Sequence, residues 1–329
     1  MSNFAASSAQ NMVRTQAASI MGNQYLNTSY SIFAPRNPGL SKGFVRQMLN
    51  VTDTSGQAFA PGSRANFQPL RDVDYVTDVA LVFTAGALPV ANWNGGATFT
   101  RWIDFIGVQA WEEIVVHSGT QRLQTLLPEE IMIYMLFWVD PVARRNIFQD
   151  VGQGTPAQRS ARSLANQDIV CQLNTCLGLR MHGDPGQGLF IRGLNDFLQF
   201  RVRLRPLNQV IETDGTAPTA TAAGFYPVGQ MQLAGYHLNN DERDMLIKQY
   251  SATPFAIHFD DQQYSTEFHI PGASALPSSH NIDLSNINQP VSAMFVLFRW
   301  RADLTRVLGG AGGSRGFNPT SQFLKIYLF

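Results

Sequence analysis

The chain has 329 residues, and its 24 lysines and arginines equal its 24 aspartates and glutamates, so its formal net charge is zero. This balance excludes an overall attraction to nucleic acid or membranes, and no run of about 18 apolar residues predicts a membrane-spanning helix. Only 15% of the residues are charged, below the roughly 25% of ordinary soluble domains, whereas 44% are hydrophobic. We therefore expect a soluble, cytosolic globular protein of two domains, with a neutral polar surface that suits coverage by further copies of the chain.

The first 95 residues predict a terminal arm followed by short β-strands. Residues 1–25 are small and polar with scattered apolar side chains, which is typical of an arm that orders against a neighbour and equally of a frayed terminus. The β-forming runs that follow are Ser29–Ala34, Phe44–Val51 and Tyr75–Phe83, with proline and glycine between them. Short strands at this spacing favour a sandwich or barrel over alternating strands and helices.

The stretch 98–127 predicts strands that end in a hairpin. Its two short runs are rich in β-branched and aromatic residues, and Ser118-Gly119 supplies a break where the backbone can take a positive φ. After the hairpin, Pro128-Glu129-Glu130 predicts the start of a helix, and a buried helix is favoured over a strand for the apolar run Ile131–Val139. Residues 150–188 are mostly small and polar, which predicts a long loop with a helix near Ser163–Leu173.

Strict alternation in Phe197–Leu207 predicts a strand with a basic stripe on one face. Its apolar residues fall on one side, and Arg201, Arg203 and Arg205 fall on the other. These arginines could meet phosphate, carboxylates of a neighbouring subunit, or water. A solvated face or a subunit contact is favoured, because phosphate binding usually involves a wider basic surface.

Residues 212–230 are rich in threonine, alanine, glycine and proline, which predicts a linker between two domains. Beyond it, Met231–Tyr236 predicts a strand that opens the second domain. Asn240 is the expected N-cap of a helix that reaches about Tyr250, since acidic residues follow it in the first turn.

Three groups of residues, taken in chain order, resemble the motifs of a known protein family. The first group is Arg101-Trp102-Ile103, Ile106-Gly107 and Ser118-Gly119-Thr120-Gln121-Arg122; the second is Leu238 with Asp241-Glu242-Arg243; the third is Asn288, Pro290, Val291 and Met294–Phe298. Together they resemble motifs of the major capsid proteins of nucleocytoplasmic large DNA viruses. Members of that family have a Gly-Gly-Gln sequence in this turn. In this chain Ser118 stands in place of the first glycine of the turn, and the residue before Gln121 is Thr120.

This resemblance implies an all-β fold of two jelly rolls in tandem, with short helices in the loops. The implied division is an arm at 1–25, a first jelly roll at 26–211, a linker at 212–230 and a second jelly roll at 231–329. About 100 residues are fewer than eight strands comfortably need, so the second jelly roll is expected to be short or incomplete.

The resemblance also implies a structural role rather than an enzymatic one. The expected function is that of a major capsid protein, which forms homotrimeric, pseudo-hexagonal capsomers and tiles an icosahedral virion shell assembled in the host cytoplasm. The implied partners are other copies of the chain and minor capsid proteins, with no specific nucleic-acid recognition and at most indirect contact with an internal membrane. The alternative is a carbohydrate-binding β-sandwich, such as a viral spike or fibre lectin, in which exposed tryptophan and tyrosine would stack on sugars.

No residue is expected to act in catalysis, to bind a cofactor or to ligate a metal. Cys171 and Cys176 are expected to be reduced, part-buried thiols, with a local disulfide as the other reading. The histidines have no metal-binding spacing of the HxH or HExxH kind, although His258 to His269 could form a cation site if their strands paired.

Overall fold

The computed structural model describes residues 45–69, 73–88, 99–179, 188–194, 196–213, 225–252 and 259. The predicted arm, the strand at 29–34, the third motif, and the 258–269 segment except for residue 259 lie outside these residues. The chain divides into two compact units, which are residues 47–235 with 255–329, and residues 1–46 with 236–254.

Most of the described strands form two antiparallel sheets. The strands are β1 (Val45–Thr52), β2 (Arg64–Phe67), β3 (Tyr75–Ala85), β4 (Thr100–Trp102), β5 (Trp111–Ser118), β6 (Gln121–Leu126), β7 (Gln167–Gln172), β8 (Leu189–Phe190), β9 (Leu198–Leu204), β10 (Ile211–Thr213) and β11 (Gly229–His237). The first sheet has the order β1-β11-β3-β7, with β8 also paired to β3, and the second has the order β2-β9-β5-β6. The strands β10 and β4 form a separate, two-stranded antiparallel sheet.

This strand order is that of a jelly roll. Numbered along the chain without the short strands β4, β8 and β10, the strands run 1-8-3-6 in the first sheet and 2-7-4-5 in the second. Eight strands in two sheets linked in this way make the double-sheet jelly roll. The all-β jelly-roll prediction is therefore confirmed for the described part of the chain.

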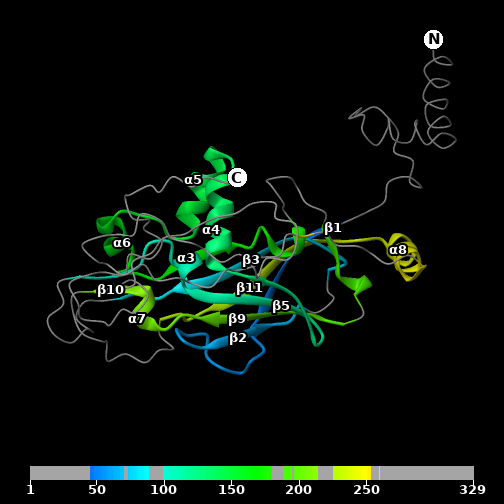
Figure 1. Ribbon diagram of the computed structural model, residues 1–329, viewed down its shortest axis with the longest axis horizontal. Helices are drawn as coiled ribbons and strands as arrows, with labels where there is room; N and C mark the ends of the chain where they lie inside the picture. Colours follow the sequence, from blue (N-terminus) through cyan, green and yellow to red (C-terminus); the bar gives the residue numbers. More distant parts are fainter. Residues whose placement is uncertain are drawn as a thin grey trace, which may run out of the picture. The chain divides into compact units, whose positions relative to one another are not determined.

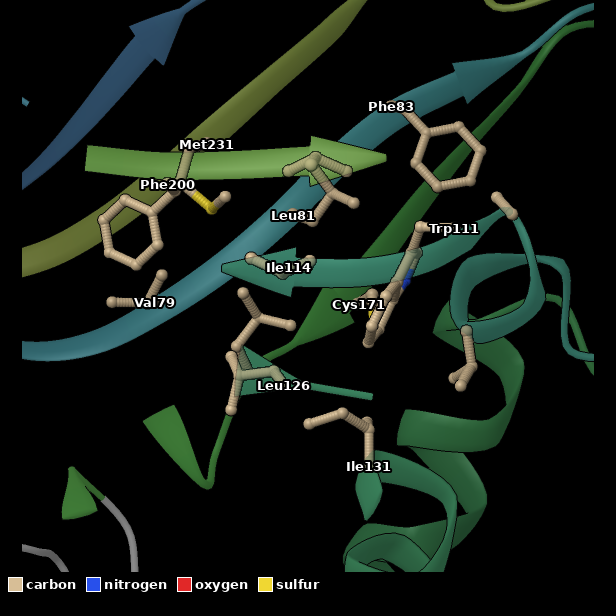
Figure 2. Close-up of a cluster of buried hydrophobic side chains, with 14 of the residues drawn as sticks. Val79, Leu81, Phe83, Trp111, Ile114, Leu126, Ile131, Cys171, Phe200 and Met231 are labelled. Atoms are coloured by element: carbon tan, nitrogen blue, oxygen red, sulfur yellow. The ribbon is translucent and has the colours of Figure 1, made fainter. Parts of the chain in front are cut away.

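The core lies between the two sheets and is drawn in Figure 2. Inward side chains of β3, such as Leu81 and Phe83, meet those of β5 and β9, such as Ile114 and Phe200. Each of these four is at most 1% exposed. The alternation of buried and accessible residues along β9 is the period of two that a sheet with one buried face requires.

The strand β11 corrects the expected domain boundary. The sequence assigns Met231–Tyr236 to the second jelly roll, yet the structure places β11 between β1 and β3 in the first. Met231 and Leu233 are fully buried in the core of the first jelly roll. The compositional linker at 212–230 therefore precedes the last strand of the first jelly roll, and a second jelly roll beyond His237 stays a prediction.

Short helices fill the connections of the jelly roll, as expected. They are α3 (Ile106–Gln109), α4 (Pro128–Phe137), α5 (Pro141–Asp150), α6 (Pro156–Arg162) and α7 (Leu207–Val210). The buried helix predicted after Pro128 is confirmed as α4, and α4 and α5 stand together beside the sheets (Figure 1). None of the described helices is long and apolar enough to cross a lipid bilayer.

The helix predicted near Ser163–Leu173 is wrong. The structure has α6 before this stretch and the strand β7 within it, where Ile169 and Cys171 point into the core. This segment pairs with Ala80–Ala85 of β3, and that pairing overrides its local preference for a helix.

The helix predicted from Asn240 is confirmed as α8 (Asn240–Ala252). Asn240 is its first helical residue, and the carbonyl O of Asn239 accepts a hydrogen bond from the backbone N of Arg243 at 2.9 Å. The cap position is thus one residue earlier than expected.

Gly107, from the first motif, packs directly against the strand β7. A Cβ atom there would lie 2.8 Å from Cγ2 of Ile169 and 3.0 Å from Cα of Val151. We expect Gly107→Ala to lower the free energy of unfolding by about 1–3 kcal/mol, because the backbone of Val151 cannot move aside cheaply. Urea denaturation measures this, with Gly154→Ala as the control, whose added Cβ would meet side chains no closer than 3.4 Å. Equal losses in both variants would contradict the packing role.

Candidate functional surface

Arginines gather on the outer face of the sheet β2-β9-β5-β6. Arg201 and Arg203 are exposed on β9, opposite the buried apolar side chains of the same strand, which confirms the predicted alternation. Arg205 lies one residue beyond the strand and is half-buried. Its Nε donates a hydrogen bond to the carbonyl O of Trp111 at 3.0 Å, so it anchors the end of β5 rather than extending the stripe.

Two arginines from other strands widen this surface. Arg64 of β2 lies directly opposite Arg203 in the antiparallel register. Arg122 of β6 lies opposite His117 of β5, and both Arg64 and Arg122 are exposed. We call Arg64, Arg122, Arg201 and Arg203 together the basic face.

Few acidic groups compensate the basic face. Arg203 pairs with Glu112 at 2.8 Å between Nε and Oε2, and these side chains are 51% and 32% exposed. Nη2 of Arg201 donates to the side-chain oxygen of Gln199 at 3.3 Å. Within the described residues, Arg64 and Arg122 form no ion pair. The face therefore carries an excess of positive charge.

His117 lies among the arginines of the basic face, and burial and two of these arginines lower its pKa. Burial lowers its pKa below the ordinary 6.5, and the positive charges of Arg201 and Arg122 lower it further. The folded state therefore binds this proton less readily than the unfolded chain, so stability falls as the pH drops below about 6.5.

We expect His117→Gln to reduce this acid sensitivity. The unfolding temperature of the wild type should fall more between about pH 7.5 and about pH 5.5 than that of the variant, when both are measured at one protein concentration. Arg122→Gln, which removes one neighbouring charge, should give an intermediate fall. Identical pH dependence in the wild type and His117→Gln would contradict the assignment.

The arginine of the first motif belongs to a buried ion cluster. Nε of Arg101 lies 2.7 Å from Oε2 of Glu212, and Nη1 of Arg159 lies 3.2 Å from the same oxygen. Arg159 also donates to the carbonyl oxygens of Trp102 at 3.0 Å and Gly154 at 3.1 Å. One carboxylate thus joins β4, β10 and α6.

The tryptophan of the same motif anchors the aromatic core. The ring of Trp102 is 1% exposed and stacks on Tyr226, with centroids 5.5 Å apart and an interplanar angle of 24°. Its Nε1 donates to the carbonyl O of Gly86 at 3.0 Å. Tyr226 in turn lies edge-on to Phe83 of β3.

The hairpin of the first motif is confirmed, with Gly119 at its turn. The φ of Gly119 is +57°, and a Cβ there would lie 2.6 Å from Oδ2 of Asp196. The Ser-Gly-Thr-Gln turn therefore requires glycine at 119 for both conformation and space. The residues of the first motif thus stabilise the framework of the jelly roll.

The thiols of Cys171 and Cys176 are free, as the sequence predicted, but they are fully rather than partly buried. Burial raises the pKa of Cys171 to about 12 and that of Cys176 further still. Such thiols are poor nucleophiles. No cluster of metal-binding side chains occurs in the part of the chain that the structure describes.

Glu212 and Arg159 were not singled out from the sequence. Glu212 is one of two acids, with Asp214, at the start of the predicted linker, and Arg159 is one of several arginines in a polar segment. The one available signal for Glu212 is its place directly after the apolar run Val210-Ile211, which resembles a strand more than a linker.

No family model matches the sequence, and none of the curated proteins matches it. Among solved structures, the chain is similar to PBCV-1 VP54, as fitted into a cryo-EM reconstruction of the virophage Sputnik, with 15% identity and a TM-score of 0.47 over 67% of this chain and 48% of that one. The PBCV-1 virus capsid matches with 16% identity and a TM-score of 0.46 over the same shares. The Faustovirus major capsid protein matches with 11% identity and a TM-score of 0.42 over 73% of this chain and 64% of that one. The chain spans about half the length of the two PBCV-1 chains.

Proposed function

We propose that this chain is a structural protein of a virion, a major capsid protein of the kind found in large DNA viruses. The observation that carries the proposal is the role of the first motif. Arg101 ties β4 to β10, and Trp102 packs on Tyr226 in the aromatic core. Gly107 packs against β7, and Gly119 forms the turn between β5 and β6 of the eight-stranded jelly roll. A motif that resembles a capsid family and specifies this framework supports membership of that family more strongly than either feature alone.

The proposed mechanism is assembly. Three copies form a pseudo-hexagonal capsomer, and capsomers tile an icosahedral shell through many weak lateral contacts that are collectively strong. Minor capsid proteins are further partners, specific recognition of nucleic acid is not part of the role, and contact with an internal membrane is indirect. Assembly takes place in the host cytoplasm, residues 1–25 act as an arm, and the chain beyond His237 belongs to a second jelly roll.

A carbohydrate-binding sandwich is the weaker candidate. Stacking on sugars needs accessible aromatic rings. Of the described tryptophans, Trp102 and Trp111 are each at most 1% exposed and Trp138 is half-buried. We assign no catalytic role to any described residue.

Light scattering on a size-exclusion column, followed by electron microscopy of the main peak, tests the proposal. We expect a particle of three times the 36.4 kDa chain mass with a pseudo-hexagonal outline. A monomer at every concentration, or a monomer that binds glycans, would contradict it.

A further inference from the structure

The basic face contains a like-charge pair that the described residues neutralise only in part, through Glu112. Arg64 and Arg203 are direct cross-strand partners, and such residues have Cβ atoms about 4.5–5.5 Å apart. Like charges in this position destabilise a sheet. Glu112 reaches Arg203 only, and it is itself partly exposed.

The basic character is stronger on this sheet than on the other. In the other sheet, the strands β3, β7, β8 and β11 contain neither lysine nor arginine, and β1 contains one arginine, Arg46. The accessible side chains of β3, β7 and β11 are neutral or acidic, as in the hydrogen bond from Thr84 to Asp168 at 2.8 Å. The arginines therefore do not reflect a general need for solubility on both sides of the sandwich.

The same chain contains a segment of opposite charge. Between Lys248 and Arg299 there is neither lysine nor arginine, and the acidic residues there are Asp260, Asp261, Glu267 and Asp283. In a chain whose net charge is zero, a basic face and an acidic segment that both recur in every copy are complementary.

We propose that the basic face binds the acidic segment 249–298 of a second copy of this chain, an inference that rests on the proposed trimer. Arginine pairs with carboxylates through two parallel hydrogen bonds, and a carboxylate between Arg64 and Arg203 would relieve their repulsion. The four arginines are exposed in the isolated chain and so are available to a neighbour. A contact between two different surfaces is heterologous, and such contacts close into a ring of three when each copy is rotated by a third of a turn relative to the next.

Nucleic acid fits this surface less well. Glu112 pairs with Arg203, and Glu113 lies opposite the same arginine in the register with β5. These two carboxylates reduce the net positive charge of the face, whereas phosphate binding usually involves a wider basic surface.

The test is charge reversal followed by charge restoration in the full chain. We expect Arg201→Glu with Arg203→Glu to raise the trimer–monomer dissociation constant at least about tenfold, measured by light scattering over a dilution series. Adding Asp260→Arg with Asp261→Arg to the same chain should restore the trimer. The matched control is Arg145→Glu with Arg162→Glu, two exposed arginines on α5 and α6, which should remain trimeric.

The outcomes separate this inference from the proposed function. A wild type that is monomeric overturns the trimer, whereas a trimer that persists in Arg201→Glu with Arg203→Glu overturns this contact alone. The proposed contact is also overturned if Asp260→Arg with Asp261→Arg does not restore the lost trimer. It is likewise overturned if Arg201→Glu with Arg203→Glu stays trimeric but no longer binds a labelled oligonucleotide. Circular dichroism checks folding, and Arg201→Gln with Arg203→Gln, which adds no repulsion, should show a smaller loss of the trimer in the same direction.

Discussion

Glu212→Gln is expected to lower the free energy of unfolding by about 3 kcal/mol, because it leaves two guanidinium groups without their shared carboxylate in a buried site. The side chains of Glu212 and Arg159 are each 9% exposed, and that of Arg101 is 18% exposed. Water therefore compensates little of the lost charge. Urea denaturation at one protein concentration measures the effect, since binding between copies also adds to apparent stability.

The control for this prediction is Glu112→Gln. It removes the carboxylate of the accessible pair with Arg203, where solvent screens the interaction, and the expected loss is below about 1 kcal/mol. If both variants lost the same amount, the buried cluster would have no special role in joining β4, β10 and α6.

Trp102→Ala is expected to lower the free energy of unfolding by about 3–5 kcal/mol, a loss at least as large as that of Glu212→Gln. The substitution opens a cavity beside Tyr226 and removes the hydrogen bond from Nε1 to the carbonyl O of Gly86. Thermal unfolding followed by circular dichroism should show a much lower transition temperature or no cooperative transition.

Tyr226→Phe is the matched control, because it keeps the ring and removes only the hydroxyl. That hydroxyl is buried and has no hydrogen-bond partner in the described structure, and burial raises the pKa of Tyr226 well above its usual range. Removing an unsatisfied buried hydroxyl should leave stability unchanged or slightly higher. A large loss in Tyr226→Phe would mean that the hydroxyl has a hydrogen-bond partner in the folded protein.

Local patterns were enough to predict much of the jelly roll. The alternation in β9, the hairpin at Gly119 and the helix after Pro128 are each set by residues close together in sequence. Period, turn chemistry and helix-start signals act over a few residues, so a single sequence contains them.

The errors concern pairings between distant segments. The composition of 212–230 predicts a linker, but Glu212 binds Arg101, and β11 belongs between β1 and β3. Nothing near β11 in sequence specifies those neighbours. The strand β7 is a similar case, since its partner in β3 lies far upstream.

The position of β11 also determines when this domain can fold during synthesis. Among the described strands, the first strand of the domain, β1, has its sheet neighbour only in the last, β11. A nascent chain that has not yet released β11 from the ribosome holds β1 without that neighbour and exposes the edge of β3. Long-range pairing of this kind makes folding slow, and unpaired strand edges promote aggregation. Chaperones would therefore act on this chain mainly before residue 237 emerges, and chains that terminate before β11 should be recovered as aggregates.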